Sequence, residues 1–291
     1  LPTHQMVATP RSDCPRCGLH RWSRISFRPP SELAPPLGRK SSSIEFGKRG
    51  GLSGTITLMT LSGTSILIVG STGGLGREFA QQLSARGAKL TLASTSAPKL
   101  GSLGIAGASA IGDVTKPGIP EHYVQTALDT FGRLDGVIYA AGAVAFGPIG
   151  DYTDEVLDAL WQVNTRGWMS TLRAATPSLA ASAAEGGSPF ALSLSGVVAE
   201  APTAGMAPYS AVKSALHSFG VAAGRELRRQ GIRLVDARPG HTETELSLHP
   251  LAGSAPAFPA GLSPQKVVER IIHGLEAGEK DLPSSSFAGL S

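Results

Sequence analysis

The chain has 291 residues, of which 41% are hydrophobic and 16% charged, so it is long enough to bury one large core. Its net charge of +4 is uneven, because residues 1–61 carry nine Lys or Arg against three Asp or Glu. Prolines and serines separate these basic residues, whereas nucleic-acid binding favours aromatic side chains interleaved with basic ones. We therefore expect no nucleic-acid partner. No apolar run approaches the ~18 residues of a spanning helix, so we expect a soluble or peripheral protein without a membrane span.

The first 61 residues lack a sustained hydrophobic period and are rich in Pro, Arg, Ser and Gly, which predicts a disordered or extended tail. The Arg- and Ser-rich, acid-poor composition would suit an organelle transit peptide, although the prolines oppose an amphipathic helix. Alternatively, translation starts at Met59, since the chain begins with Leu and MTLSGTSILIVG is a natural start. The second interpretation is favoured. We expect a cytoplasmic protein, with organelle import only if residues 1–58 are a genuine transit segment.

The tail also holds the only two cysteines, Cys14 and Cys17, in a single CPRC sequence. A tetrahedral zinc site would need two further ligands, for which only His4 and His20 lie close. We interpret the cysteines as incidental and predict no metal site.

From residue 62 onward, short apolar runs alternate with stretches of helical periodicity, which is typical of βαβ units with parallel strands. Residues 62–291 are therefore expected to form one doubly wound, Rossmann-type α/β domain, with about seven parallel strands and helices on both faces. The expected strands are 65–70, 89–94, 108–112, 136–142, 190–195 and 232–240, with a short seventh in EKDLP. The expected helices are 76–87, 121–132, 156–180, 209–230 and 264–278.

A glycine-rich turn, GSTGGLG at residues 70–76, joins the first expected strand to the first expected helix. Glycines there let the backbone approach a pyrophosphate, and the helix N-terminus offers free N–H groups and a positive dipole end. The spacing is G-x-x-x-G-x-G, which differs from the usual G-x-G-x-x-G fingerprint. The strand–turn–helix context nevertheless favours nucleotide binding over tight packing alone.

Tyr209 and Lys213 are four residues apart at the start of an expected helix, so they share one of its faces. In isolation such a pair is usually a surface pair without a role. Beside a nucleotide, the ammonium is expected to favour phenolate and lower the phenol's pKa from ~10. Tyr209 could then exchange a proton with a substrate oxygen as a general acid or base.

Ser195 ends an expected strand fourteen residues before Tyr209. The carboxyl end of a parallel strand borders the ligand crevice, so we expect the Ser195 hydroxyl to face that crevice. There it would hydrogen-bond the substrate oxygen and stabilise developing negative charge. Ser193, on the same side of the strand, is expected to lie deeper.

Taken in order, these motifs resemble those of the short-chain dehydrogenase/reductase family over about residues 62–280. The resemblance implies a Rossmann-type domain, a nicotinamide cofactor, a small carbonyl or alcohol substrate and a homo-oligomer, either a dimer or a tetramer. It also implies that Lys213 holds the nicotinamide ribose and that Asn164 bends its helix and holds a water leading toward Lys213. The motifs that carry it are Gly70, Gly74 and Gly76, Asp113-Val114, YAAG (139–142), Asn164, Ser195, Tyr209-x-x-x-Lys213 and Pro239-Gly240.

Two departures from the family pattern stand out. The family usually has Asn where this chain has Tyr139, so the bracing hydrogen bonds of that asparagine must be replaced, while Ala141 and Gly142 remain. The family's spacing between its serine and tyrosine is often one residue shorter than that between Ser195 and Tyr209.

The second expected strand ends in LASTSAPKL, without the acid that NAD-preferring members tend to have there. Hydroxyl groups at this end could bind a 2′-phosphate, so NADP(H) is the preferred cofactor and NAD(H) the alternative. Asp113 and Val114 are implied to contact the adenine, and Pro239 and the residues after it the nicotinamide carboxamide. The expected cofactor-binding residues are Gly70, Ser71, Thr72, Gly74, Leu75, Gly76, Arg77, Ser94, Thr95, Asp113, Val114, Ala141, Gly142, Tyr209, Lys213, Pro239, Gly240, Thr242 and Thr244.

Three functions are weighed against one another. The leading hypothesis is an NADP(H)-dependent carbonyl reductase or alcohol dehydrogenase, with Asn164, Ser195, Tyr209 and Lys213 as catalytic residues. A non-catalytic cofactor-binding regulator would be natural had Tyr209 or Lys213 been lost, and an interaction protein would act through its basic tail. Residues 243–264, rich in Pro, Ala and Gly, are expected to form a lid over a modest apolar pocket.

Overall fold

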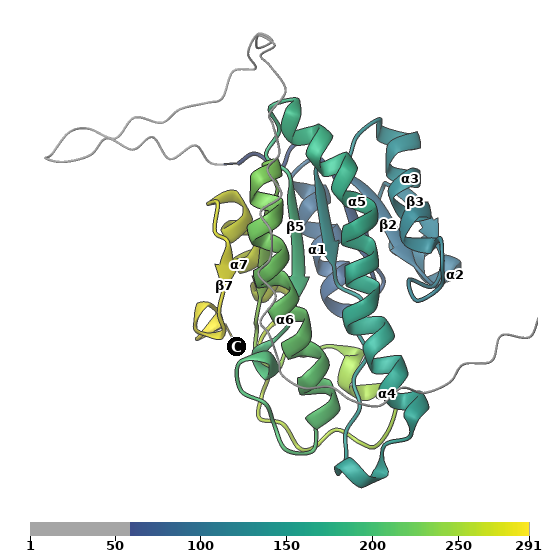
Figure 1. The fold of residues 1–291 in the computed structure, drawn as a ribbon, viewed down its shortest axis with the longest axis vertical. Helices are drawn as coiled ribbons and strands as arrows, with labels where there is room; N and C mark the ends of the chain where they lie inside the picture. Colours follow the sequence, from purple (N-terminus) through teal and green to yellow (C-terminus); the bar gives the residue numbers. More distant parts are fainter. Residues whose placement is uncertain (1–58, 291) are drawn as a thin grey trace, which may run out of the picture. The chain divides into compact units, whose positions relative to one another are not determined.

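The computed structural model describes residues 59–290, in which seven parallel strands form one twisted sheet (Figure 1). The strand order is β3-β2-β1-β4-β5-β6-β7, so the chain winds outward in one direction from β1 and then in the other from β4. The strands are β1 (Ser65–Val69), β2 (Lys89–Ser94), β3 (Ala108–Ile111), β4 (Gly136–Tyr139), β5 (Phe190–Leu194), β6 (Arg233–Ala237) and β7 (Asp281–Leu282). This confirms the predicted Rossmann-type fold class.

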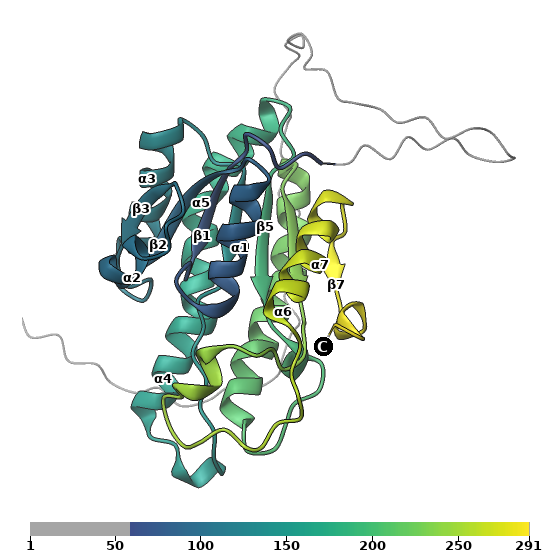
Figure 2. The same ribbon diagram turned by 180° about the vertical axis from the view of Figure 1, so that it is seen from behind.

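Helices cover both faces of the sheet. On one face, α3 (Ile119–Phe131), α5 (Gly167–Ala184) and α6 (Ala207–Leu227) bury Trp168, Leu172 and Leu216 against the strands. On the other face, α1 (Gly74–Ala85) and α7 (Pro264–Glu276) lie side by side (Figure 2) and bury Phe79 and Ile271. Two further helices, α2 (Ala97–Gly101) and α4 (Asp154–Trp161), complete the fold.

The apolar face of each covering helix is buried because it packs on a sheet whose strands carry apolar side chains on both faces. In β1, all five residues are buried, since β2 and β4 pair with its two edges and helices cover its two faces. A continuous apolar run such as SILIV is what a central parallel strand requires. Its side chains alternate between the apolar clusters on the two faces, with Ile66 and Ile68 in one and Leu67 and Val69 in the other.

Apart from shifts of up to three residues at the ends of elements, the structure differs from the prediction at three places. The stretch expected as one helix over 156–180 is divided into α4, a π-helical segment at Gln162–Arg166, and α5. The short helix α2 was not predicted, because five residues are too few to show a helical period. The packed chain also begins before residue 62: Leu61 lies in the core, and the Met59 N–H donates to the Glu276 carbonyl.

Candidate active site

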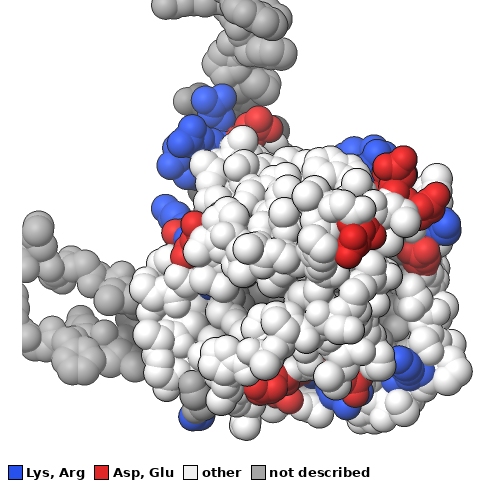
Figure 3. All heavy atoms as spheres, turned by 90° about the horizontal axis from the view of Figure 1, so that it is seen from below, with Lys and Arg blue, Asp and Glu red and all other residues white. Residues whose placement is uncertain are grey.

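The carboxyl ends of the strands border a pocket of about 620 Å³, on a face that is hollowed near its centre (Figure 3). Residues after β1, β2, β3, β4, β5 and β6 line it, together with the start of α6. β1 and β4 are neighbours from which the chain winds in opposite directions, and such a switch point is where open α/β sheets bind ligands.

The glycine turn forms one wall of this pocket. Gly70 has φ of 83°, and a Cβ on it would lie 2.6 Å from the Ala141 nitrogen. A Cβ on Gly76 would lie 2.1 Å from the Gly70 carbonyl oxygen, so α1 can start this close to the turn only with glycine there. A Cβ on Gly74 would lie 2.6 Å from Thr244 Cγ2. The glycines thus let the turn pack closely against neighbouring segments, while the backbone of Gly73 and Gly74 stays exposed at the pocket.

The helix that follows the turn presents an electropositive end. Gly73 precedes α1 without a side-chain cap, and no acidic residue lies in the first helical turn. The first N–H groups of a helix have no partner within it, and their dipoles favour a negative charge. The wall formed by the turn and α1 is therefore suited to a phosphate group.

Tyr209 and Lys213 lie one turn apart on α6, and both line the pocket. Lys213 is 6% exposed, its Nζ donates to the Leu194 carbonyl over 2.8 Å, and it lies 5.6 Å from the centre of the Tyr209 ring. The ammonium therefore lies over the face of the Tyr209 ring. Burial raises the pKa of Tyr209, so the expected lowering of this pKa by Lys213 is wrong for the protein chain by itself. Burial also lowers the pKa of Lys213 to about 8, against the opposing charge of Asp236.

Asn164 lies in the π-helical segment and is fully buried. Its amide nitrogen donates to the carbonyls of Leu160 and Ala143, each over 2.9 Å, and its oxygen accepts from the Ala143 N–H. Gly142 lies between it and the lysine, since a Cβ there would be 3.3 Å from Asn164 Oδ1 and 4.0 Å from Lys213 Nζ. The helix is thus irregular at Asn164, where the resemblance implied a bend.

Tyr139 replaces the asparagine of the family pattern at the end of β4. Its hydroxyl donates to the Val163 carbonyl in the π-helical segment over 2.5 Å, and its ring lies 5.5 Å from that of Trp168. A Cβ on Gly167 would lie 2.2 Å from the phenol oxygen, so this contact requires glycine at the start of α5. Tyr139 therefore joins β4 to the segment that carries Asn164.

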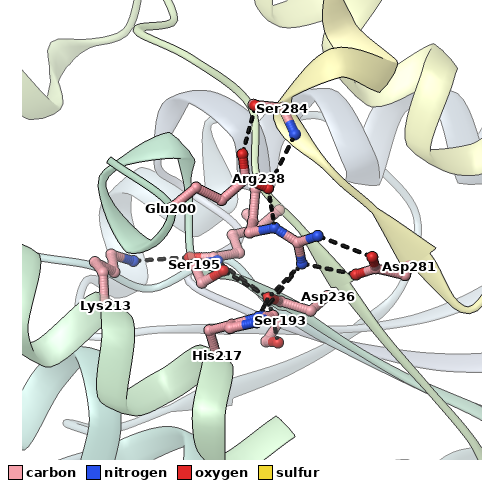
Figure 4. Close-up of polar contacts among 10 residues, drawn as sticks. Ser193, Ser195, Glu200, Lys213, His217, Asp236, Arg238, Asp281 and Ser284 are labelled. Carbon is pink, nitrogen blue, oxygen red and sulfur yellow. Dashed lines mark hydrogen bonds and ion pairs between the residues drawn. The ribbon is translucent and has the colours of Figure 1, made fainter. Parts of the chain in front are cut away.

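The Ser195 hydroxyl does not face the pocket as expected, although the residue lies at the pocket wall. Ser195 is fully buried and donates to Asp236 Oδ2 over 2.6 Å (Figure 4). Ser193 donates to the other carboxylate oxygen over 2.9 Å, and His217 Nδ1 lies 2.8 Å from Oδ2. The cause is the pairing of β5 with β6, which places Ser193 directly beside Asp236. Gly196, one residue after Ser195, carries no hydroxyl and has φ of 76°.

Asp236 belongs to a larger charged cluster around β6 and β7 (Figure 4). Arg238 donates to Asp236 and Asp281, and it also pairs with Glu200, which in turn accepts from Ser284. Hydrogen bonds to Asp281 are the main reason that the pKa of Arg238 is raised. The buried Asp236 carboxylate thus accepts hydrogen bonds from Ser193, Ser195 and Arg238.

Most of the expected cofactor-binding residues line the pocket. Three do not: Ser71 is buried and donates to the Ala93 carbonyl, Gly76 is buried behind the turn, and Arg77 is exposed outside the lining. Ser94 shares a hydrogen bond of 2.8 Å with Thr72, whereas Thr95 is exposed at the pocket edge. The lining set is Gly70, Thr72, Gly74, Leu75, Ser94, Thr95, Asp113, Val114, Ala141, Gly142, Tyr209, Lys213, Pro239, Gly240, Thr242 and Thr244.

Sequence reasoning missed the residues that pack around Tyr209. Val144, Phe146 and Met206 form a buried apolar cluster, and Tyr209 and Phe258 pack against it. His241 follows Pro239-Gly240 and stacks on Phe258, with ring centres 4.5 Å apart. The position of His241 directly after that motif was a usable signal, whereas nothing local marked Phe146 or Met206. The expected lid does contribute to the pocket, through Thr244, Glu245, Leu246, Ser247, His249 and Phe258.

Within residues 59–290, no group of three or more His, Cys, Asp or Glu could hold a metal ion. Cys14 and Cys17 lie outside the described residues. In the same part of the chain, no helix is long and apolar enough to cross a membrane.

Comparison with known proteins decides the family. A profile described as short chain dehydrogenase matches residues 64–250. The chain belongs to the short-chain dehydrogenase family. An uncharacterized oxidoreductase of Staphylococcus aureus strain MRSA252 is 28% identical over 214 residues, which cover 72% of this chain and 89% of that protein. The protein is therefore an oxidoreductase of the short-chain dehydrogenase type, as the resemblance predicted.

Solved structures share its fold. A 3-ketoacyl-(acyl-carrier-protein) reductase from Brucella melitensis, complexed with NADH, superposes with a TM-score of 0.70 at 23% identity, over 77% of this chain and 96% of that one. A short chain dehydrogenase from Burkholderia cenocepacia J2315, in complex with NADP, gives 0.68 at 24% identity, over 78% and 90%.

Proposed function

We propose that this short-chain dehydrogenase transfers hydride between NADP(H) and a carbonyl or alcohol substrate, with Tyr209 as the general acid or base. The observation that carries the proposal is the placement of Tyr209 and Lys213 one turn apart in the wall of the pocket that the glycine turn also borders. The presence of both residues argues against a non-catalytic cofactor-binding regulator.

The residues at the glycine turn fit a dinucleotide. The exposed backbone of Gly73 and Gly74, together with the uncapped N-terminus of α1, would accept the pyrophosphate. Asp113, which lines the pocket, would contact the adenine, and Lys213 the ribose. When bound, the nicotinamide supplies or accepts the hydride.

Tyr209 is suited to give a proton to a carbonyl oxygen. Because burial raises the pKa of its phenol, Tyr209 is protonated at neutral pH. The pKa of Lys213 is lowered only to about 8, so at pH 7 most molecules carry the ammonium. After the proton leaves Tyr209, that positive charge stabilises the phenolate, and the low local dielectric strengthens the attraction.

Two other residues act through their neighbours in this proposal. Asn164 holds the backbone at Ala143 and supports the implied proton relay toward Lys213. Ser195, whose hydroxyl proton is donated to Asp236, positions β5 and with it the Leu194 carbonyl that accepts from Lys213. We propose this positioning role in place of direct polarisation of the substrate.

NADP(H) is the proposed cofactor because the end of β2 offers hydroxyl groups and no carboxylate. Ser94 and Thr72 form a hydrogen-bonded pair there, with Thr95 exposed beside them. NAD(H) is the alternative, since the related solved structures include one complexed with NADH and one with NADP. Assembly into a dimer or tetramer remains a prediction by resemblance, and a cytoplasmic location remains a prediction from the sequence.

The test is Tyr209→Phe, which removes only the transferable proton. Turnover should fall at least about 100-fold, while the affinity for reduced nicotinamide cofactor, followed by its fluorescence, stays within about threefold. Tyr152→Phe is the matched control, because Tyr152 packs near Tyr209 but its hydroxyl lies 3.3 Å from the carbonyl oxygens of Ala145 and Gly205, which are outside the pocket lining. Activity of Tyr209→Phe within about tenfold of the unchanged protein would exclude the assigned role.

A further inference from the structure

The part of the pocket beside Tyr209 is apolar. Val144, Phe146 and Met206 are buried there, and Val198 and Phe258 pack against them. The rings of Phe146 and Phe258 lie 6.0 Å apart between centres, at an angle of 57°. A substrate whose carbonyl oxygen reaches Tyr209 must place its neighbouring groups against these side chains.

Cations are scarce in the same pocket. Lys213 is the one Lys or Arg among the described lining residues, and its Nζ is buried and donates to Leu194. Of the two lining acids, Asp113 is proposed to contact the adenine, and Glu245 on the lid would repel an anionic substrate. Of the two lining histidines, His241 lies 3.7 Å from Glu243, and His249 is exposed on the lid.

The surface around the hollow agrees with this. Figure 3 shows that the middle of this face is free of Lys, Arg, Asp and Glu, which gather toward its edges. A dinucleotide would place its pyrophosphate at the N-terminus of α1, whereas a carboxylate substrate would meet no concentrated positive charge on this face.

We propose that the substrates of this site are uncharged carbonyl compounds with an apolar aryl or alkyl group beside the C=O, and the corresponding alcohols. The inference rests on the proposed function. Burying a ring or alkyl chain against Phe146, Met206 and Phe258 removes apolar surface from water, which favours binding. Burying a carboxylate there without a partner is strongly unfavourable, so an acid of the same shape should be rejected.

A matched pair of ketones tests the proposal on the full chain. Methyl 4-acetylbenzoate and 4-acetylbenzoate share one ring and one reacting carbonyl, and they differ mainly in charge. We expect kcat/KM to be at least about 100-fold higher for the ester, because only the acid must lose its hydration without a partner. Cyclohexanone with 4-oxocyclohexanecarboxylate repeats the comparison without an aromatic ring. Equal values, or higher values for the acids, overturn the proposal.

A variant with a new cation gives a second readout. Val198→Arg adds a positive charge to the apolar cluster and should improve the ratio of acid to ester by at least about tenfold. Ile149→Arg is the matched control, since Ile149 is 71% exposed and lies outside the pocket lining. If Val198→Arg does not fold, as judged by its unfolding transition, the ketone pairs with the unchanged protein still decide the question.

Failure of this proposal can be told from failure of the proposed function by cofactor binding, which needs no substrate. Protein that quenches or enhances the fluorescence of NADPH or NADH, but turns over only the acids, overturns the substrate class alone. Protein that binds a cofactor but turns over neither the acids nor the neutral ketones behaves as a non-catalytic cofactor-binding protein and overturns both proposals. Protein that binds neither cofactor overturns the proposed function, and the substrate class with it.

Discussion

Ser195 donates its hydroxyl proton to Asp236 Oδ2 over 2.6 Å, at the point where strands β5 and β6 lie side by side. A hydroxyl has one proton, so Ser195 cannot donate to a substrate oxygen while this bond is formed. Hydrogen bonds to charged groups contribute about 1.5–3 kcal/mol, so rotating the hydroxyl toward the pocket would be costly. We therefore infer that the Ser195 hydroxyl holds the end of β5 against β6.

Ser195→Ala should lower the free energy of unfolding by about 1–3 kcal/mol and reduce kcat by less than about tenfold. Ser193→Ala is the matched control, because Ser193 donates to the same carboxylate from a deeper position. Similar effects of the two changes support a positioning role. A loss of about 100-fold or more in kcat with Ser195→Ala alone would instead mean that this hydroxyl stabilises the transition state.

Asp236→Asn should move the alkaline decline of kcat/KM to lower pH. The charge of Asp236 raises the pKa of Lys213 against the larger effect of burial, so removing that charge lowers this pKa further below about 8. Asp281→Asn is the control, since Asp281 shares Arg238 with Asp236 but does not act on Lys213. Rate profiles from pH 6 to 10 decide the outcome. An unmoved decline in Asp236→Asn, or an equal shift in both variants, contradicts the assignment.

Lys213→Met should raise the stability of the protein while abolishing most turnover. The pKa of Lys213 falls from 10.5 to about 8 on folding, so below pH 8 the buried ammonium destabilises the folded state in full. After allowance for the lost hydrogen bond to Leu194, we expect a gain of about 1–2 kcal/mol at pH 7. The gain should shrink as the pH rises from 8 to 10.5, because the folded lysine is then neutral and the free energy needed to remove the proton that the unfolded chain still holds falls with pH.

Denaturant unfolding at several pH values measures this gain. Lys89→Met provides the comparison, since it removes the same charge from an exposed position at the start of β2. A constant difference between Lys213→Met and the unchanged protein across this range would show that the lysine is not under the inferred desolvation.

Thr95→Asp should shift the preference from NADP(H) toward NAD(H) by about tenfold or more in the ratio of kcat/KM values. Thr95 is exposed at the pocket edge beside Ser94, so a carboxylate there would repel a 2′-phosphate. Thr95→Asn has nearly the same size without the charge and should leave the ratio within about threefold. If both variants keep the original ratio, the phosphate is bound elsewhere.

The path of the backbone could be predicted from sequence because each strand and helix carries a local periodic pattern. Apolar runs such as SILIV and KLTLAS marked β1 and β2, and the glycine spacing at 70–76 marked the turn between strand and helix. The prediction failed at α2, which is too short to show a period, and at the π-helical segment. Asn164 lies in a stretch whose apolar spacing is still helical, so only the resemblance indicated a bend.

Contacts between segments that are distant in the sequence could not be predicted from such local patterns. Tyr139 replaces a family asparagine, and its hydroxyl reaches the Val163 carbonyl only because Gly167 leaves room for it. Neither Tyr139 nor Gly167 signals the other in sequence, since they lie on different elements that meet only after β4 and α5 pack together.

By itself, the sequence determined the fold class, the glycine turn and the shared face of Tyr209 and Lys213, because all three follow from spacing along one element. Only the tertiary structure decided which way side chains point and how they ionise. The Ser195 hydroxyl is turned by an aspartate on the next strand, and burial among residues from several elements raises the pKa of Tyr209 where the lysine alone had suggested a decrease. Hydrogen-bond partners and desolvation depend on everything that surrounds a group, and that surrounding exists only once the chain has folded.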